Sequence, residues 1–360
     1  MEQKRLGDIA TYINGYAFKP EDRGSTGLPI IRIQDLTGNA YDLGFYDGKY
    51  PEKIEINDGD VLISWSASLG VYIWNRGKGL LNQHIFKVVF DKCEVNKQYF
   101  VFAVKHKLKE MELKTHGATM KHIVKKDFDN TVIPFPTVEK QADIAYILSK
   151  IESIVEFRQQ ELQQLDDLIK ARFVEMFGDM YLNSKGWPEA KLESMADVVS
   201  GITKGRKTKA EDLTEVPYMA VSNVKDGYID WTTVKTIEAT QQEIEQYRLL
   251  ADDVLMTEGG DPDKVGRGAI IKEPLENCIH QNHIFRVRLD ESMILPEFFA
   301  EYLQHQRSKR YFLGCAKQTT GIASINMTQL RALPVLMPPL SRQEEFVLFK
   351  AQVNKSKLLE

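Results

Sequence analysis

The sequence predicts an α+β protein in which two homologous mixed α/β domains are separated by one long coiled-coil helix. Two observations carry this prediction: the chain repeats itself over nearly its full length, and the segment between the two copies has a sustained helical period. A third is that the second copy starts the same helix again near the end of the sequence. The expected organisation is a pseudo-twofold internal repeat with a truncated second helix.

The internal repeat rests on ordered matches between the two halves of the chain. Leu6, Ala10 and Gly15 align with residues 192, 196 and 201, and the run Asn82–Val88 aligns with Gln281–Val287. The offset between matching residues grows from 186 to 202 while their order is kept. This is typical of two copies of one unit with small loop insertions in the second copy.

Each copy shows the same succession of elements: an opening helical turn, short β-runs between Gly, Asn and Asp turns, a helical stretch, and a final strand that ends at prolines. The opening turns are Leu6–Ile9 and Leu192–Met195, and the helical stretches are Lys97–Met111 and Pro296–Leu313. The expected strands are Pro29–Ile33, Val61–Ile63, Val71–Trp74 and Ile85–Phe90, then Tyr218–Val221, Val254–Met256, Ala269–Ile271 and Ile284–Val287.

The segment between the copies predicts a long helix, because residues 138–177 contain neither Gly nor Pro. Its apolar residues step alternately by four and three, the period of a coiled-coil seam. The seam comprises Ile144, Leu148, Ile151, Val155, Leu162, Leu165, Ile169 and Met176, interrupted by Arg158 and Arg172. At 1.5 Å per residue such a helix spans about 55 Å.

Four segments follow: a first domain over residues 1–136, a central helical spacer over 137–185, a second domain over 186–338, and the start of a second helix over 339–360. Residues 339–349 parallel 137–147. By the repeat offset the second helix should run to residue 380, so about 20 of its residues are expected to be missing.

Composition indicates a globular cytoplasmic protein with reduced cysteines. Cys93, Cys278 and Cys315 are odd in number and form no CxxC pair, and no apolar run is long enough to span a membrane. The net charge is −4, and no segment is strongly basic: residues 1–136 carry +2 and residues 186–338 carry −4. Any contact with nucleic acid must therefore come from local basic clusters.

Signatures of catalysis and of metal binding are missing from the sequence. The glycine-rich run Gly259–Gly268 lacks the spacing of a phosphate-binding loop. His280 and His283 could hold a metal only from a helix, whereas His84 and His283 lie in matching strand-like contexts. Hydrogen-bonded structural histidines are the better interpretation.

Several motifs together resemble the specificity subunits of type I restriction–modification systems. Leu165–Asp179, followed by Asn183-Ser-Lys-Gly-Trp187, resembles the end of the central conserved helix of that family. Arg5–Ala10 and Lys191–Ala196 resemble the starts of its target-recognition domains. The loops before each last strand and the starts of both helices are similar as well (Gly117–Ile123, Gln318–Ile325, Pro134–Gln141 and Leu336–Gln343).

The resemblance implies a non-catalytic, sequence-specific DNA-binding subunit. Each target-recognition domain would read one half of a bipartite, asymmetric site in double-stranded DNA. The conserved helices would dock two methyltransferase subunits, which methylate adenine, and a separate ATP-dependent subunit would translocate and cut DNA. This chain would carry no cofactor or metal, since S-adenosylmethionine, ATP and Mg belong to those partners. With a short second helix it is expected to dock partners poorly or to self-associate.

DNA contacts are expected from polar and basic residues in turns, where loops would face a groove. In the first domain the candidates are Tyr16, Lys19, Arg32, Gln34, Arg76, Lys78, Thr119, Lys121 and His122. In the second they are Lys204, Arg206, Lys207, Lys209, Ser222, Asn223, Lys225, Arg267, Gln318, Thr319 and Thr320.

Two other classes of protein stay open on the sequence alone. A stand-alone nuclease or methyltransferase would bind S-adenosylmethionine or cleave DNA as a purified chain. A duplicated scaffold that binds only proteins would have no affinity for DNA even with methyltransferase partners present.

Overall fold

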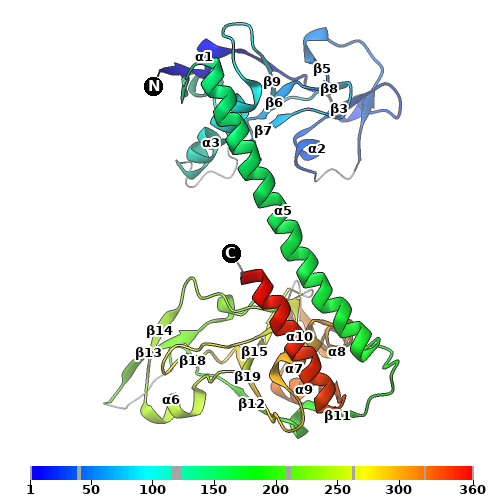
Figure 1. Ribbon diagram of the computed structural model, residues 1–360, viewed down its shortest axis with the longest axis vertical. Helices are drawn as coiled ribbons and strands as arrows, with labels where there is room; N and C mark the ends of the chain where they lie inside the picture. The colour runs from blue at the N-terminus through cyan, green and yellow to red at the C-terminus, as the bar shows by residue number, and fades with distance from the viewer. Residues whose placement is uncertain are drawn as a thin grey trace. The chain divides into compact units, whose positions relative to one another are not determined.

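The computed structural model describes residues 2–38, 42–114, 123–206, 212–261, 264–319 and 322–358, and it divides into two compact units, Met1–Arg158 and Gln159–Glu360 (Figure 1). The side chains of residues 112–114, 318, 319 and 322 are also outside the description. In the part of the chain so described, no helix combines the length and the apolar character that crossing a membrane requires.

The first unit contains two four-stranded sheets and a strand pair. Its strands are β1 (Gln3–Arg5), β2 (Thr11–Asn14), β3 (Leu28–Ile31), β4 (Phe45–Tyr46), β5 (Glu55–Ile56), β6 (Val61–Ser64), β7 (Gly70–Ile73), β8 (Gly79–Leu81), β9 (Ile85–Val89) and β10 (Val132–Pro134). Its helices are α1 (Leu6–Ile9), α2 (Ile33–Thr37), α3 (Lys97–Lys114) and α4 (Lys125–Asp129), with the start of α5 (Val138–Phe177). The sheet orders are β2-β9-β6-β7 and β4-β3-β8-β5, and β1 pairs with β10.

The second unit repeats this plan in part, with one four-stranded sheet, two three-stranded sheets and a strand pair among its described residues. Its strands are β11 (Glu189–Lys191), β12 (Ala196–Ser200), β13 (Thr214–Met219), β14 (Lys235–Ala239), β15 (Val254–Thr257), β16 (Gly259–Gly260), β17 (Gly268–Ile270), β18 (Ile279–His280), β19 (Ile284–Leu289), β20 (Lys317–Thr319), β21 (Ile322–Ser324) and β22 (Pro334–Leu336). Its helices are the end of α5, α6 (Gln241–Tyr247), α7 (Pro296–Gln304), α8 (Gln306–Cys315), α9 (Met327–Arg331) and α10 (Leu340–Leu358).

Strand pairing gives the repeat its clearest structural form. The sheet β12-β19-β15-β17 has the order of β2-β9-β6-β7, and β11 pairs with β22 as β1 pairs with β10. In both units one parallel pair, β3 with β8 and β13 with β18, joins distant parts of the chain. A Cβ at Gly15 or Gly201 would lie 2.0 or 1.9 Å from a carbonyl oxygen, so the matching glycines allow the same close backbone approach.

Two details of the helices differ from the sequence-based prediction. The stretch Pro296–Leu313 is not one helix: it breaks into α7 and α8 at His305, whose backbone is extended. The turn predicted at Leu192–Met195 is a 3₁₀ helix over Leu192–Ser194. The long helix ends as predicted, at Gly178, whose φ of +79° favours glycine.

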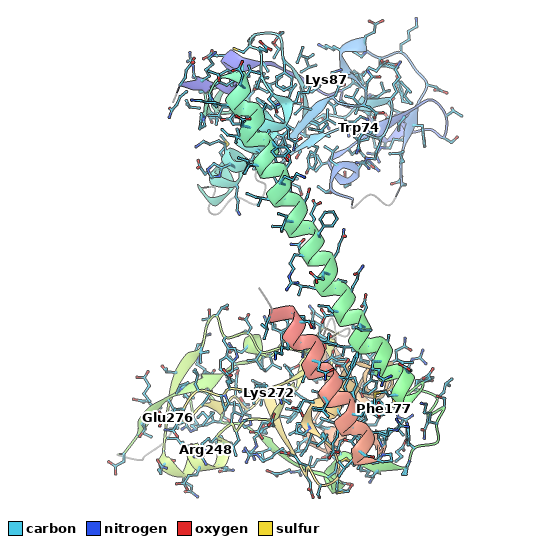
Figure 2. All side chains as sticks on the ribbon, in the orientation of Figure 1. Trp74, Lys87, Phe177, Arg248, Lys272 and Glu276 are labelled. Carbon is cyan, nitrogen blue, oxygen red and sulfur yellow. The ribbon has the colours of Figure 1, made fainter. Side chains whose placement is uncertain are left out.

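The C-terminal part of α5 and α10 pack antiparallel in the core of the second unit (Figure 1). Arg172 pairs with Glu345 at 2.9 Å and Asp166 with Lys357 at 2.6 Å. The aromatic centre of this contact is formed by Phe173, Phe346 and Phe177, of which the last is labelled in Figure 2.

Only part of the predicted seam is buried. Ile169 and Met176 lie in the core of the second unit and Leu165 packs against it. Ile144, Leu148 and Leu162 are half-buried, whereas Ile151 and Val155 are about half exposed. Phe173 and Phe177, which the seam did not include, are fully buried. The 3.5-residue pattern therefore describes the apolar face of α5 without saying which part of that face is covered.

One buried glutamine ties each helix to its unit. Gln141 donates from Nε2 to the carbonyl of Pro136 (2.8 Å) and accepts from the amide of Asn96 (2.9 Å). Gln343 likewise donates to Pro338 (2.8 Å) and accepts from Leu295 (2.8 Å). Both side chains are fully buried, so each satisfies backbone groups that water cannot reach.

The glutamine contact predicts a loss of stability on Gln343→Leu. The substitution leaves the Pro338 carbonyl and the Leu295 amide without their side-chain partner, and each buried group left so costs about 1–3 kcal/mol. We expect the free energy of unfolding of the second unit to fall by at least about 2 kcal/mol in urea titrations. Gln160→Leu, at an exposed position of α5, is the matched control. An unchanged midpoint for Gln343→Leu would contradict this role.

Candidate nucleic-acid interface

Both units have the same corner where β6 or β15 ends. In the first unit the Trp65 amide donates to the carbonyl of His84 (3.2 Å), and its carbonyl accepts from the Ile123 amide (2.9 Å). In the second unit Glu258 makes the same two bonds, to His283 (3.0 Å) and from Ile325 (2.8 Å). Trp65 and Glu258 are therefore structural equivalents, at a position where the backbone is kept and the side chain differs.

The first-unit candidates that the structure describes fall into separate groups. Tyr16 is exposed and its backbone bridges to Asn82, beside the corner. Gln34 and Arg76 are exposed near α2, where Arg76 donates to the carbonyl of Asp35 (2.6 Å). Lys19 is exposed, and Lys78 pairs with Glu55 at 2.9 Å. Thr119, Lys121 and His122 lie outside the described residues.

The interpretation of Arg32 as a DNA contact has to be corrected. Arg32 is only 8% exposed, and its guanidinium pairs with Asp35 and Asp42 (Nε to Oδ2 3.2 Å, Nη2 to Oδ1 3.5 Å). Its backbone amide donates to Asp35 as well (2.8 Å). The side chain holds the turn into α2, and a cation engaged in this way is not presented to a phosphate.

Asn223 needs the same correction in the second unit. It is 3% exposed, accepts from the Ala220 amide (2.9 Å) and donates to the carbonyls of Asp230 (2.8 Å) and Thr233 (3.0 Å). Both hydrogens of the amide nitrogen are used inside its own loop and the side chain is buried, so Asn223 is not presented to a base. Asn223 occupies the position that Asp35 has in the first unit, where a side-chain oxygen also caps the turn.

The Arg206 side chain makes contacts within the second unit that hold its fold. It pairs with Glu243, and this hydrogen bond, above all, lowers the pKa of the Glu243 carboxyl to about 2. Glu243 also caps α6 by accepting from the Thr240 amide (2.9 Å). Arg206 therefore fixes the start of α6, which a basic-cluster interpretation of the sequence could not anticipate.

The other second-unit candidates vary in accessibility. Lys204 and Ser222 are exposed, Arg267 is half-buried, and Lys225 lies 3.8 Å from Asp230. Gln318 and Thr319 belong to β20, in the hairpin beside the Glu258 corner. Their side chains, and all of Lys207, Lys209 and Thr320, lie outside the described residues.

The two histidines of the second unit have different surroundings. His280 is fully buried, with Nδ1 3.0 Å from the Tyr247 carbonyl and Nε2 3.3 Å from that of Val199, and burial lowers its pKa to about 4. This agrees with a structural histidine. His283 instead has a half-exposed side chain and pairs with Glu258. Among the described residues no three His, Cys, Asp or Glu side chains are placed to hold a metal ion.

Trp65, Glu258 and His283 were absent from the sequence-based candidates. The match of residues 82–88 with 281–287 already placed His84 and His283 at equivalent positions. The DNA-contact candidates were chosen for basic, hydroxyl and amide side chains, so Glu258 and Trp65 were left out. The repeat, rather than residue type, was the feature of the sequence that could have identified this corner.

Comparison with known proteins gives the family. The model of the type I restriction modification DNA specificity domain matches residues 1–167 and, a second time, residues 184–356. The chain belongs to this family. Each match spans one of the two repeated units, so the duplication seen in the strand order is also a duplication of the family's domain.

Relatives of known function support the same conclusion. The specificity subunit of the type I restriction enzyme EcoBI from Escherichia coli is 22% identical over 370 residues, covering 95% of this chain and 77% of that protein. That of EcoKI, from Escherichia coli strain K12, is 24% identical and covers 95% and 79%. The expected function, a DNA sequence-specificity subunit of a type I restriction–modification system, is confirmed.

A solved structure shares the fold. The crystal structure of the S subunit of a type I restriction–modification system from M. genitalium superposes with a TM-score of 0.56. The match covers 99% of this chain and 90% of that one at 14% sequence identity. The predicted fold class, two mixed α/β domains with a long helix, is confirmed at the level of the fold.

The buried His280 predicts acid sensitivity of the second unit. The pKa of His280 is about 4 in the folded chain against an ordinary value of 6.5. Between these two pH values the imidazole is protonated in the unfolded chain but neutral in the folded one. The contribution of the neutral His280 to the free energy of unfolding is therefore fully present above pH 6.5 and is lost as the pH falls toward 4. The loss is about 1 kcal/mol at pH 5.5. Urea titrations at pH 7.5 and 5.5 measure this, and His280→Gln should flatten the difference.

Exposed His106 provides the control for this measurement, since His106→Gln should leave the pH dependence as it is. An equally steep loss of stability in His280→Gln would show that other groups cause the acid sensitivity.

Proposed function

We propose that this specificity subunit reads a bipartite, asymmetric DNA site, one half with each unit, and performs no catalytic step itself. The observation that carries the proposal is the pair of equivalent corners with different side chains, Trp65 and Glu258. Two domains with one backbone plan and different surfaces are suited to two different sequences. Sequence-specific contacts come from such side chains, and phosphate contacts from the exposed lysines around them.

Catalysis would belong to partner subunits in the cytoplasm. In the proposed complex two methyltransferase subunits use S-adenosylmethionine to methylate adenine in the site, and an ATP- and Mg-dependent subunit translocates and cuts DNA. This chain would supply their sequence specificity and would hold none of these cofactors. The finding that favours this division is family membership across both units.

Mapping of adenine methylation in cells that carry the intact system tests the proposal. The expected result is a two-part motif with unlike halves that disappears when the gene for this chain is deleted. Methylation or cleavage of DNA by the purified chain alone would favour a stand-alone enzyme instead. A methylation map unchanged by the deletion would contradict the proposed role.

The docking surface for a modification subunit is proposed to be the apolar stripe of α5, defined as Tyr146, Ile147, Ile151, Ile154, Val155 and Phe157. Its side chains are between 49% and 68% exposed, an unusual amount of large apolar surface on one helix. Ile151 and Val155 continue the seam whose later residues, Ile169 and Met176, are buried. A partner's amphipathic helix is the occupant that would extend the same packing.

The docking proposal predicts that Ile154→Glu weakens assembly with the modification subunits by at least about tenfold, because a buried unpaired carboxylate is costly. Co-purification and light scattering measure it. Ser153→Glu, on an exposed neighbouring position, adds the same charge and should assemble normally. A complex unaffected by Ile154→Glu, together with an isolated dimer that this variant makes monomeric, would show the stripe to be a self-association contact instead.

A further inference from the structure

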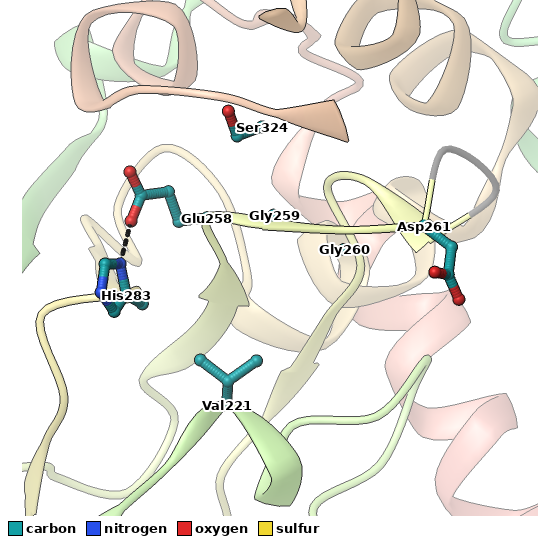
Figure 3. Close-up of a pocket in the computed structure, with 7 residues that line it drawn as sticks. All are labelled: Val221, Glu258, Gly259, Gly260, Asp261, His283 and Ser324. Carbon is teal, nitrogen blue, oxygen red and sulfur yellow. Dashed lines mark hydrogen bonds and ion pairs between the residues drawn. The ribbon is translucent and has the colours of Figure 1, made fainter. Parts of the chain in front are cut away.

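The Glu258 corner of the second unit opens into a surface pocket of about 520 Å³ (Figure 3). Glu258 follows directly on β15, Gly259 and Gly260 form β16, His283 lies in the turn before β19, and Ser324 ends β21. One oxygen of the Glu258 carboxylate accepts from Nδ1 of His283, while the other points away from the imidazole (Figure 3). The pocket therefore presents a carboxylate oxygen held in a fixed direction.

The first unit has its own pocket at the equivalent corner, of about 350 Å³, lined by Asn14, Trp65, Phe86, Ile123, Val124 and Lys125. The Trp65 indole donates to Oδ1 of Asn14 (3.2 Å) and stacks on Phe86, with ring centroids 5.6 Å apart. Both units therefore have a pocket at the equivalent corner. The pocket of the first unit is apolar and aromatic, and that of the second unit is acidic.

Stability does not account for the acidic version. Both Glu258 and His283 are partly exposed, at 35% and 56% of their side chains, and ion pairs of that kind contribute only about 0–1 kcal/mol. The contacts that keep the corner in place are backbone bonds, which the first unit makes with a tryptophan instead. The side chain at this position is consequently free to differ according to what the pocket binds.

Basic residues lie next to the segments that line the second pocket, as Arg267 accepts at its carbonyl from the amide of Thr257, the neighbour of Glu258. Lys317 lies opposite Ser324 across the β20–β21 hairpin, and Lys264 and Arg267 follow the acidic loop residue Asp261, which pairs with Lys264. Among the residues that the structure describes, a Cβ at Gly260 would have only the Lys264 Cβ within 4 Å, at 3.7 Å. This bare stretch of backbone lets another molecule approach closely.

On a surface that must accept a polyanion, a carboxylate is repelled by phosphates and is favourable only where it meets a hydrogen-bond donor. In the major groove the donors are the exocyclic amino groups of cytosine (N4) and adenine (N6), whereas guanine and thymine present oxygen acceptors. An apolar pocket instead suits the methyl group of thymine.

We propose that Glu258, oriented by His283, reads an amino-bearing base, cytosine or adenine, in the half-site of the second unit, while the Trp65 pocket takes a thymine methyl in the half-site of the first. This inference rests on the proposed function and names the base chemistry that each unit selects. Arg267 and Lys317 would contact phosphates on either side of the base read by Glu258.

The test replaces Glu258 with glutamine, which keeps the size of the side chain but adds donors. The assembled complex with its modification subunits is used, and the bound sequences are selected from random double-stranded DNA. We expect the preference at one position of one half-site to fall by about tenfold or more, with guanine or thymine newly accepted, and the other half-site unchanged. Glu276→Gln, at an exposed carboxylate that does not line the pocket (labelled in Figure 2), is the matched control.

A second variant, Trp65→Phe, keeps an aromatic ring but removes the indole that shapes the first pocket. It should change a thymine position in the opposite half-site only. An unchanged motif for Glu258→Gln in a complex that still selects a two-part site would overturn the inference and leave the proposed function intact. Absence of any sequence preference in the wild-type complex would be a failure of the proposed function itself.

Discussion

The buried amides of Gln141 and Gln343 join each helix to the unit that it leaves. Each glutamine bonds the carbonyl of the proline two residues after the last strand, β10 or β22, and the backbone amide just before α3 or α7, at 2.8–2.9 Å. Since a buried polar group must be paired, these bonds fix the start of α5 to the first unit and the start of α10 to the second. The proposed docking of a partner on α5 depends on that junction.

The two units share this scaffold and differ in the side chains at the corners that we propose to read DNA. Backbone bonds at the corner are the same within a few tenths of an ångström, but tryptophan occupies one corner and a glutamate–histidine pair the other. Duplication gives two sites on the same backbone fold. Exposed side chains in the two copies can then differ with little effect on the free energy of unfolding.

The repeat and both ends of α5 follow from local pattern, so the sequence alone predicts them. The eight predicted strands each overlap an observed strand, but Ile33 and Val221, predicted to end two of them, begin α2 and a 3₁₀ helix, and short strands such as β2 and β14 were not predicted. The break at His305 and the burial of Phe173 and Phe177 depend on packing between distant segments, which periodicity does not describe. The same is true of Arg32, Asn223 and Arg206: as exposed-looking polar residues in turns they resemble DNA contacts, but their partners in space occupy them. Residue type predicts the chemistry available at a position, and only the fold shows whether that chemistry is already used.

Each unit is proposed to read one half of the site independently. This is tested most directly with a chain in which the second domain, residues 186–338, replaces the first, residues 1–136, joined at the matching helix starts. Methylation mapping of the assembled complex should then yield a site whose two halves are the same sequence. A site that keeps two unlike halves, one of them that of the unit removed, would contradict the account.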